Sequence, residues 1–185
     1  MNSNIPSWLA LAPVALLCAA APTVAHATQY LTVAQAQRTL FPSASAFLDR
    51  SLTFTPAQRK AIANASRVGV NAKVQIVFEA RGPGGRVGWL FLDQVLGKHE
   101  LISYALALDA TGAVRAIEIL DYRETYGGEI RNPKWRQQFV GKRAGAALQL
   151  DRDIRNISGA TLSSRHVTDG VRRLLATYAL FFANS

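Results

Sequence analysis

The sequence predicts a single α+β domain in which a small antiparallel sheet is packed by helices. Four segments between residues 73 and 120 have the length and apolar patterning of strands. Glycine-containing turns at 82–85 and 109–112 join them in pairs, which indicates two successive hairpins. A long amphipathic helix is expected over 163–182, and 185 residues is the usual length of one domain.

The part of the chain before these strands is predicted to be helical. Residues 31–48 place apolar side chains near helical spacing, with Pro42 as a kink. Thr55 and Pro56 are residue types favoured at the start of a helix, and Ile62 is the expected core contact of that helix. We therefore divide the chain after residue 27 into an N-terminal helical segment, 28–72, and a domain over 73–182.

The four strands are expected over 73–80, 87–95, 100–108 and 113–120. Residues 122–150 are polar, basic and rich in glycine, with one helical turn expected from Asn132 to Phe139. Residues 153–158 have the pattern of a short strand or loop. The final helix should bury one apolar face, made by Val167, Val171, Leu174, Leu175 and Tyr178.

The first 27 residues have the pattern of an export signal. An apolar stretch over 8–25 ends in Ala25-His26-Ala27, which predicts cleavage after Ala27, and an uncleaved anchor is the alternative. Either way the rest of the chain is expected outside the cytoplasm, in the periplasm, soluble or held at the outer face of the inner membrane. The net charge of +9 favours anionic partners, but export argues against nucleic acid.

After residue 27 the chain has no cysteine and only two histidines, His99 and His166. Disulfides, thiolate metal sites, iron–sulfur clusters and thioether-linked haem are therefore excluded, and no metal site is expected. Redox chemistry would need an organic cofactor. His99 beside Glu100 is the type of pair used in acid–base catalysis. The alternative, that His99 is a structural or solvent-facing histidine, is favoured, and no catalytic residue is assigned.

The run from Ile157 to Ser164 leads directly into the predicted final helix. Gly159 permits a sharp turn and close approach of a ligand, and four hydroxyl residues surround the helix start. The free amide groups of a helix N-terminus bind phosphate well. The alternative is that one of these hydroxyls simply caps the helix, since serine and threonine are common capping residues.

Ser158-Gly159-Ala160-Thr161 resembles the S/T-G-A-T motif of the FMN-binding domain family, which includes subunits of the sodium-pumping NADH:quinone reductase and of the Rnf complex. The resemblance implies that FMN is the cofactor and that its phosphate is esterified to Thr161 by a flavin transferase, from FAD and with magnesium. Many members carry an Asp three residues before the motif, where this chain has Arg155.

A second segment, Glu124-Thr125-Tyr126-Gly127, is similar to the family's E-T-x-G segment, and Gly97-Lys98 fits the same layout. The resemblance covers about residues 73–182. It implies a cofactor-binding set made of Thr161, Ser158, Gly159, Ala160, Leu162, Ser163, Glu124, Thr125, Tyr126 and Gly127.

Other residues are candidates for flavin contacts on their chemistry alone. Tyr126, Trp135 and Trp89 can stack on the isoalloxazine ring, although aromatic residues more often lie in the core. A basic cluster can hold the phosphate or form a solvated face: Arg123, Arg131, Lys134, Arg136, Lys142 and Arg143. Asn156-Ile157-Ser158 has the form of a glycosylation site, which we interpret as chance.

The sequence thus favours an exported flavoprotein that relays electrons between membrane or periplasmic redox proteins, rather than a stand-alone enzyme. Two alternatives stay open. One is a non-redox exported module that binds a phosphorylated ligand or a membrane surface at the same helix start. The other is a flavin-dependent reductase acting on a small molecule.

Overall fold

The structure, a computed structural model, describes residues 28–124 and 128–185. Its elements are, in order, β1 (Thr28–Gln29), α1 (Val33–Leu40), β2 (Ala46–Asp49), β3 (Leu52–Thr53), α2 (Pro56–Ser66), β4 (Val74–Gly82), β5 (Gly85–Leu96), β6 (Leu101–Asp109), β7 (Val114–Tyr122), the 3₁₀ turn η1 (Gly128–Arg131), α3 (Pro133–Arg136), the 3₁₀ turn η2 (Gln137–Phe139) and α4 (Thr161–Phe181).

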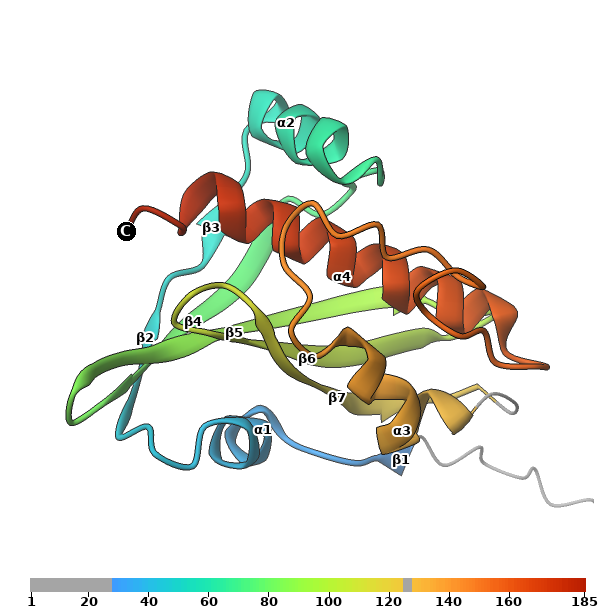
Figure 1. The fold of residues 1–185 in the computed structure, drawn as a ribbon, viewed down its shortest axis with the longest axis horizontal. Coiled ribbons are helices and arrows are strands. Elements are labelled where there is room, and N and C mark those ends of the chain that lie inside the picture. Colours follow the sequence, from blue (N-terminus) through green and yellow to red (C-terminus); the bar gives the residue numbers. More distant parts are fainter. Residues whose placement is uncertain (1–27, 125–127) are drawn as a thin grey trace, which may run out of the picture.

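One antiparallel sheet runs in the order β1-β7-β6-β5-β4-β2, and β3 pairs with β4 beside that path. Figure 1 shows α4 lying along one face of this sheet, α1 under the other face, and α2 stacked on the outer side of α4. The predicted α+β class and both hairpins, β4–β5 and β6–β7, are confirmed. The last helix is confirmed too, and it begins two residues earlier than expected, at Thr161.

The main core lies between α4 and the sheet. Strand residues such as Phe91, Leu106 and Ile117 meet the apolar face of α4, which includes Val171 and Leu174. A smaller core lies on the other face, where α1 packs against apolar side chains of β4, β5 and β6. Burying apolar surface on both faces explains why β5 and β6 have nearly continuous apolar runs instead of alternation.

The helical prediction for residues 31–48 is wrong after Leu40. Helix α1 ends there, and residues 46–49 form strand β2, which pairs antiparallel with β4. Pro42 cannot continue the hydrogen-bond ladder of the helix, and the open edge of β4 gives the following residues another partner. The second predicted helix is confirmed as α2, with Thr55 capping it through the amide of Gln58 and Ile62 fully buried.

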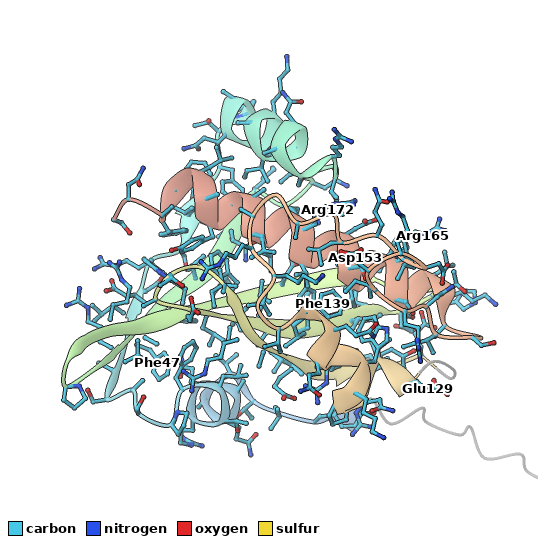
Figure 2. All side chains as sticks on the ribbon, in the orientation of Figure 1. Phe47, Glu129, Phe139, Asp153, Arg165 and Arg172 are labelled. Atoms are coloured by element: carbon cyan, nitrogen blue, oxygen red, sulfur yellow. The ribbon has the colours of Figure 1, made fainter. Side chains whose placement is uncertain are left out.

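The expected helical turn at 132–139 is confirmed as α3 and η2, and residues 153–158 form a loop. The segment from η2 to α4 runs back over the outer side of α4. There Arg172 of α4 donates hydrogen bonds to the carbonyl oxygens of Ala147 and Leu148, at 3.3 and 3.4 Å. Figure 2 labels Arg172 and Asp153 where this loop passes the helix. The loop therefore has a fixed path to Thr161.

Candidate functional site

The S-G-A-T run forms the turn that enters α4. Gly159 has φ +80°, a left-handed conformation that glycine adopts without strain, and Thr161 is the first helical residue. The N-cap position is Ala160, which has no side-chain hydrogen-bonding group, and no side-chain cap hydrogen bond is present there. The expectation that one of the nearby hydroxyls caps the helix is therefore wrong.

The four hydroxyl residues of this run separate into two pairs. Ser163 and Ser164 are buried, and Ser164 Oγ donates to the carbonyl oxygen of Ala160 at 2.9 Å, while Ser163 hydrogen-bonds with Tyr122. Ser158 and Thr161 are exposed. Thr161 Oγ1 accepts only a long contact, 3.4 Å, from the side-chain amide of Asn156 among the hydrogen bonds found for the described residues. Its hydroxyl is thus reachable from solvent.

A hollow of about 530 Å³ opens beside Thr161. Its lining comes from three separate segments: Lys98 and His99, Glu124, and Gly159 to Ser163. The volume lies within the range of small-molecule and cofactor sites. The lining combines positive charge, the exposed hydroxyl of Thr161 and the apolar side chain of Leu162, which is 41% exposed. These residues fit a ligand that has both a phosphate and an apolar ring.

The carboxylate of Glu124 is turned toward the β5–β6 connection. Glu124 Oε1 accepts hydrogen bonds from the backbone amides of His99, at 2.6 Å, and Glu100, at 3.0 Å. Burial works to raise the pKa of this carboxyl, but amide hydrogen bonds from residues 98–100 and the charge of His99 outweigh it and lower the pKa. Glu124 is therefore a carboxylate near neutral pH.

The structure keeps the other aromatic candidates away from the hollow. Trp135 is buried and donates from Nε1 to the carbonyl oxygen of Arg155 at 2.7 Å. Trp89 is buried against Tyr178 and Phe182 at the C-terminal end of α4, about 25 Å along the helix from Thr161. Both are core residues. Thr125, Tyr126 and Gly127 lie outside the described residues, as do the first 27 residues of the chain.

The predicted basic cluster does not gather at Thr161. Arg136 pairs with Glu118 at 2.6 Å, Lys142 with Asp153 at 3.5 Å, and Arg131 stacks over the ring of Tyr30. Arg143 bonds the carbonyl and hydroxyl oxygens of Thr111, Arg123 pairs with Asp121, and Lys134 is exposed. The basic residues that line the hollow are instead Lys98 and His99.

Arg155, at the position of the family's Asp, is exposed, and its backbone amide donates to Gln138 Oε1 at 2.7 Å. Asp153 is the nearest upstream acid, but its carboxylate is occupied within its own loop. It accepts from the amides of Leu148 and Gln149 at 2.9 and 2.6 Å, and these bonds help to lower its pKa against the effect of burial. Asp153 thus fixes the loop and does not replace the missing acid.

A larger hollow, about 820 Å³, lies on the sheet face opposite α4. It is bordered by apolar side chains such as Val74, Ile76 and Leu101, which are 43–52% exposed. No residue of the S-G-A-T run and no described residue of the E-T-x-G segment lines it. We therefore assign the candidate site to the smaller hollow, which is lined by both Glu124 and residues 159–161 of the S-G-A-T run.

Comparison with known proteins indicates which ligand the chain takes. Residues 97–176 match the model of the FMN-binding domain family. The chain carries an FMN-binding domain. FMN is its cofactor, and both the Lys98–His99 turn and the entry into α4 lie within the matched residues.

Two individual proteins are similar to the chain. A component of the Na⁺-translocating NADH-quinone reductase of Yersinia pestis is 36% identical over 135 residues, which are 63% of this chain and 49% of that component. The chain therefore spans about half the length of this curated relative. The crystal structure of NqrC from Shewanella oneidensis matches with a TM-score of 0.55 and 16% identity, over 80% of this chain and 86% of that one. At that identity the match shows a shared fold.

Among the residues that the structure describes, no helix is long and apolar enough to cross a membrane.

Proposed function

We propose that this protein is an exported flavoprotein that holds FMN through a phosphoester on Thr161 and relays electrons between membrane-associated redox partners. The observation that supports the ester most directly is the hydroxyl of Thr161, which is exposed at the uncapped start of α4 beside a hollow of cofactor size. The similarity to a component of a Na⁺-translocating NADH-quinone reductase supports the role in electron transfer.

The chain's own residues have distinct parts in this proposal. Thr161 Oγ replaces AMP on the FMN phosphate of FAD: the new ester bond forms as the phosphoanhydride bond breaks, and the hydroxyl proton leaves to solvent. A flavin transferase that uses magnesium catalyses this step. The free amides at the start of α4 stabilise the esterified phosphate, and Leu162 offers an apolar contact beside it. The bound flavin supplies the redox chemistry.

The attachment is tested by mass spectrometry of protein co-expressed with an active flavin transferase. We expect one added FMN on the wild type and none on Thr161→Ala. Thr53→Ala is the matched control, because Thr53 is an exposed threonine on β3, outside the site, and should leave the added mass unchanged. Thr161→Ser keeps the hydroxyl and should accept FMN.

Two outcomes would contradict the attachment. One is an unmodified wild-type chain while the transferase modifies another target, and the other is an FMN mass retained by Thr161→Ala. A colourless protein with no flavin absorbance would instead favour a module that binds a phosphorylated ligand without redox chemistry.

The proposed export rests on the apolar stretch over 8–25 and the Ala25-His26-Ala27 pattern. It is tested by fractionating cells and sequencing the N-terminus of the recovered protein. A periplasmic chain that begins at Thr28 supports cleavage, and a membrane-bound chain that keeps residues 1–27 supports an anchor. Recovery of the full chain in the cytoplasm would contradict export.

A further inference from the structure

The connection between β5 and β6 forms the wall of the hollow that faces Thr161. Lys98 and His99 lie at its tip, both are exposed, and both line the hollow. Leu96 and Leu101 pair across the hairpin directly below, so the tip is a short turn on a continuous two-stranded ladder. Two basic residues therefore line the same space as Thr161.

This turn is held by one carboxylate from another strand end. Two consecutive backbone amides, those of His99 and Glu100, donate hydrogen bonds to Glu124 Oε1 at 2.6 and 3.0 Å. Within the turn the amide of Gly97 also donates to the carbonyl oxygen of Glu100, at 2.7 Å. Successive amides that converge on an anion form a compact, charge-assisted arrangement. The carboxylate of Glu124 thus serves as the hydrogen-bond acceptor that holds the turn.

Gly97 makes this arrangement possible because the carboxylate passes directly over its Cα. A Cβ atom at position 97 would overlap Glu124 Oε1 and lie 3.1 Å from Glu124 Cγ. Both contacts are closer than ordinary van der Waals distance, and Gly97 is buried. Any side chain there would displace Glu124 from the amides.

We propose that Lys98 and His99 contact the phosphate esterified to Thr161, and that Glu124 is a positioning residue that fixes their turn without binding the flavin. This inference rests on the proposed function. Its reason is electrostatic. An ionised Glu124 in the lining of the hollow would repel a phosphate, but two backbone amides bond to its Oε1 and offset part of that charge, while the basic residues Lys98 and His99 line the same hollow. The turn is therefore a third part of the site, outside both motifs.

The role of Glu124 is tested without flavin, by amide hydrogen exchange on the full chain. Glu124→Gln should speed exchange at residues 99 and 100 about tenfold or more, and Gly97→Ala should do the same. Glu129→Gln is the matched control, because Glu129 is an exposed acid close by in sequence. Exchange at residues 99 and 100 that stays at the wild-type rate in Glu124→Gln would overturn the positioning role, whether or not flavin binds.

The contact with phosphate is tested by ³¹P NMR on the flavin-loaded protein. Lys98→Ala and His99→Gln should each shift the phosphodiester signal, and Lys60→Ala, at an exposed lysine on α2, should leave it unchanged. A signal that is identical in all three variants would overturn the contact. If no ester forms on Thr161, the proposed function fails and this contact fails with it, while the exchange result still decides the role of Glu124.

Discussion

The two ends of α4 are built in opposite ways. At the C-terminal end, Tyr178 and Phe182 pack against the buried ring of Trp89, with centroids 6.2 and 4.6 Å away. At the N-terminal end the helix begins at Thr161, its N-cap residue Ala160 offers no side-chain cap, and Thr161 and Leu162 are exposed. One end therefore contributes stability through burial, whereas the other leaves polar groups and space for a ligand.

The largest effect that would test this comparison is expected from Trp89→Ala. Removing a fully buried aromatic ring leaves a cavity between β5 and the end of α4. We expect a loss of about 3–5 kcal/mol in the free energy of unfolding, measured by urea denaturation. A loss below about 1 kcal/mol would mean that this end of the helix is not a main source of stability.

Substitution of two glycines by alanine should give smaller losses of stability that can be compared directly. Gly112 and Gly159 both have φ +80°, but a Cβ at Gly112 would overlap the ring of Tyr178, whereas nothing lies within 4 Å of one at Gly159. Gly112→Ala combines backbone strain with overlap and should cost about 2–4 kcal/mol. Gly159→Ala should cost only the strain, about 1–2 kcal/mol. Urea denaturation of both variants measures the difference, and equal losses would contradict it.

One carboxylate lies near each end of α4, and the two can be compared by how the stability of the fold depends on pH. Glu79, the cross-strand partner of Trp89, is buried and paired with Arg50, Arg81 and Arg86. Burial works to raise its pKa, but the three arginines outweigh it and lower the pKa, as the amides do for Glu124. Both groups therefore stabilise the fold above the ordinary carboxyl pKa, and this stability is lost as the pH falls through the lowered values.

Glu79→Gln should cost about 1–3 kcal/mol at pH 7, because it removes a buried partner from three arginines that are themselves partly exposed. Glu124→Gln should cost less, since Glu124 is only partly buried. For both variants the difference from the wild type should shrink below about pH 4, in denaturation measured at pH 7 and pH 3. If the loss of stability caused by either substitution were larger at pH 3 than at pH 7, the carboxylate would not stabilise the fold in its ionised form, and this prediction would be wrong.

The smallest effect on stability is expected from Thr161→Ala. Its hydroxyl is exposed and makes only the long contact with Asn156, so the free energy of unfolding of the flavin-free chain should change by less than about 0.5 kcal/mol. The same substitution should abolish flavin attachment. A large loss of stability would instead indicate that Thr161 has a structural role.

The main framework can be predicted from the sequence because its signals are periodic. The hairpins follow from apolar runs joined by glycine turns, and α4 follows from a sustained helical period. The prediction fails at residues 46–49 because a short apolar segment fits either helix or strand, and the edge of β4 decides between them. The predicted start of α4 is two residues late because Ala160, a poor capping residue, occupies the N-cap.

The site is predictable only where a motif marks it. The S-G-A-T run and Glu124 both line the hollow, but Lys98 and His99 belong to a turn that tertiary packing brings there from β5 and β6. Gly97-Lys98 is predicted only as part of the family's layout, and the further signal is that two basic residues follow a glycine at a hairpin tip. The basic residues at 123–143 do not predict the site, because their partners depend on loop geometry that the sequence does not reveal. For example, Lys142 pairs with Asp153, which lies in a loop where Leu148 and Asp151 have left-handed backbone conformations.

The fixed loop before α4 has a consequence for the order of events in maturation. Trp135 and Gln138 bond the backbone of Arg155 from the side of α3, and the carboxylate of Asp153 fastens the preceding turn. The backbone that leads to Thr161 is therefore held by contacts within the protein itself, and Thr161 is exposed at its end. On the proposed function, folding can come first and prosthetic-group loading second, so a modifying enzyme would meet a finished protein surface rather than a nascent polypeptide.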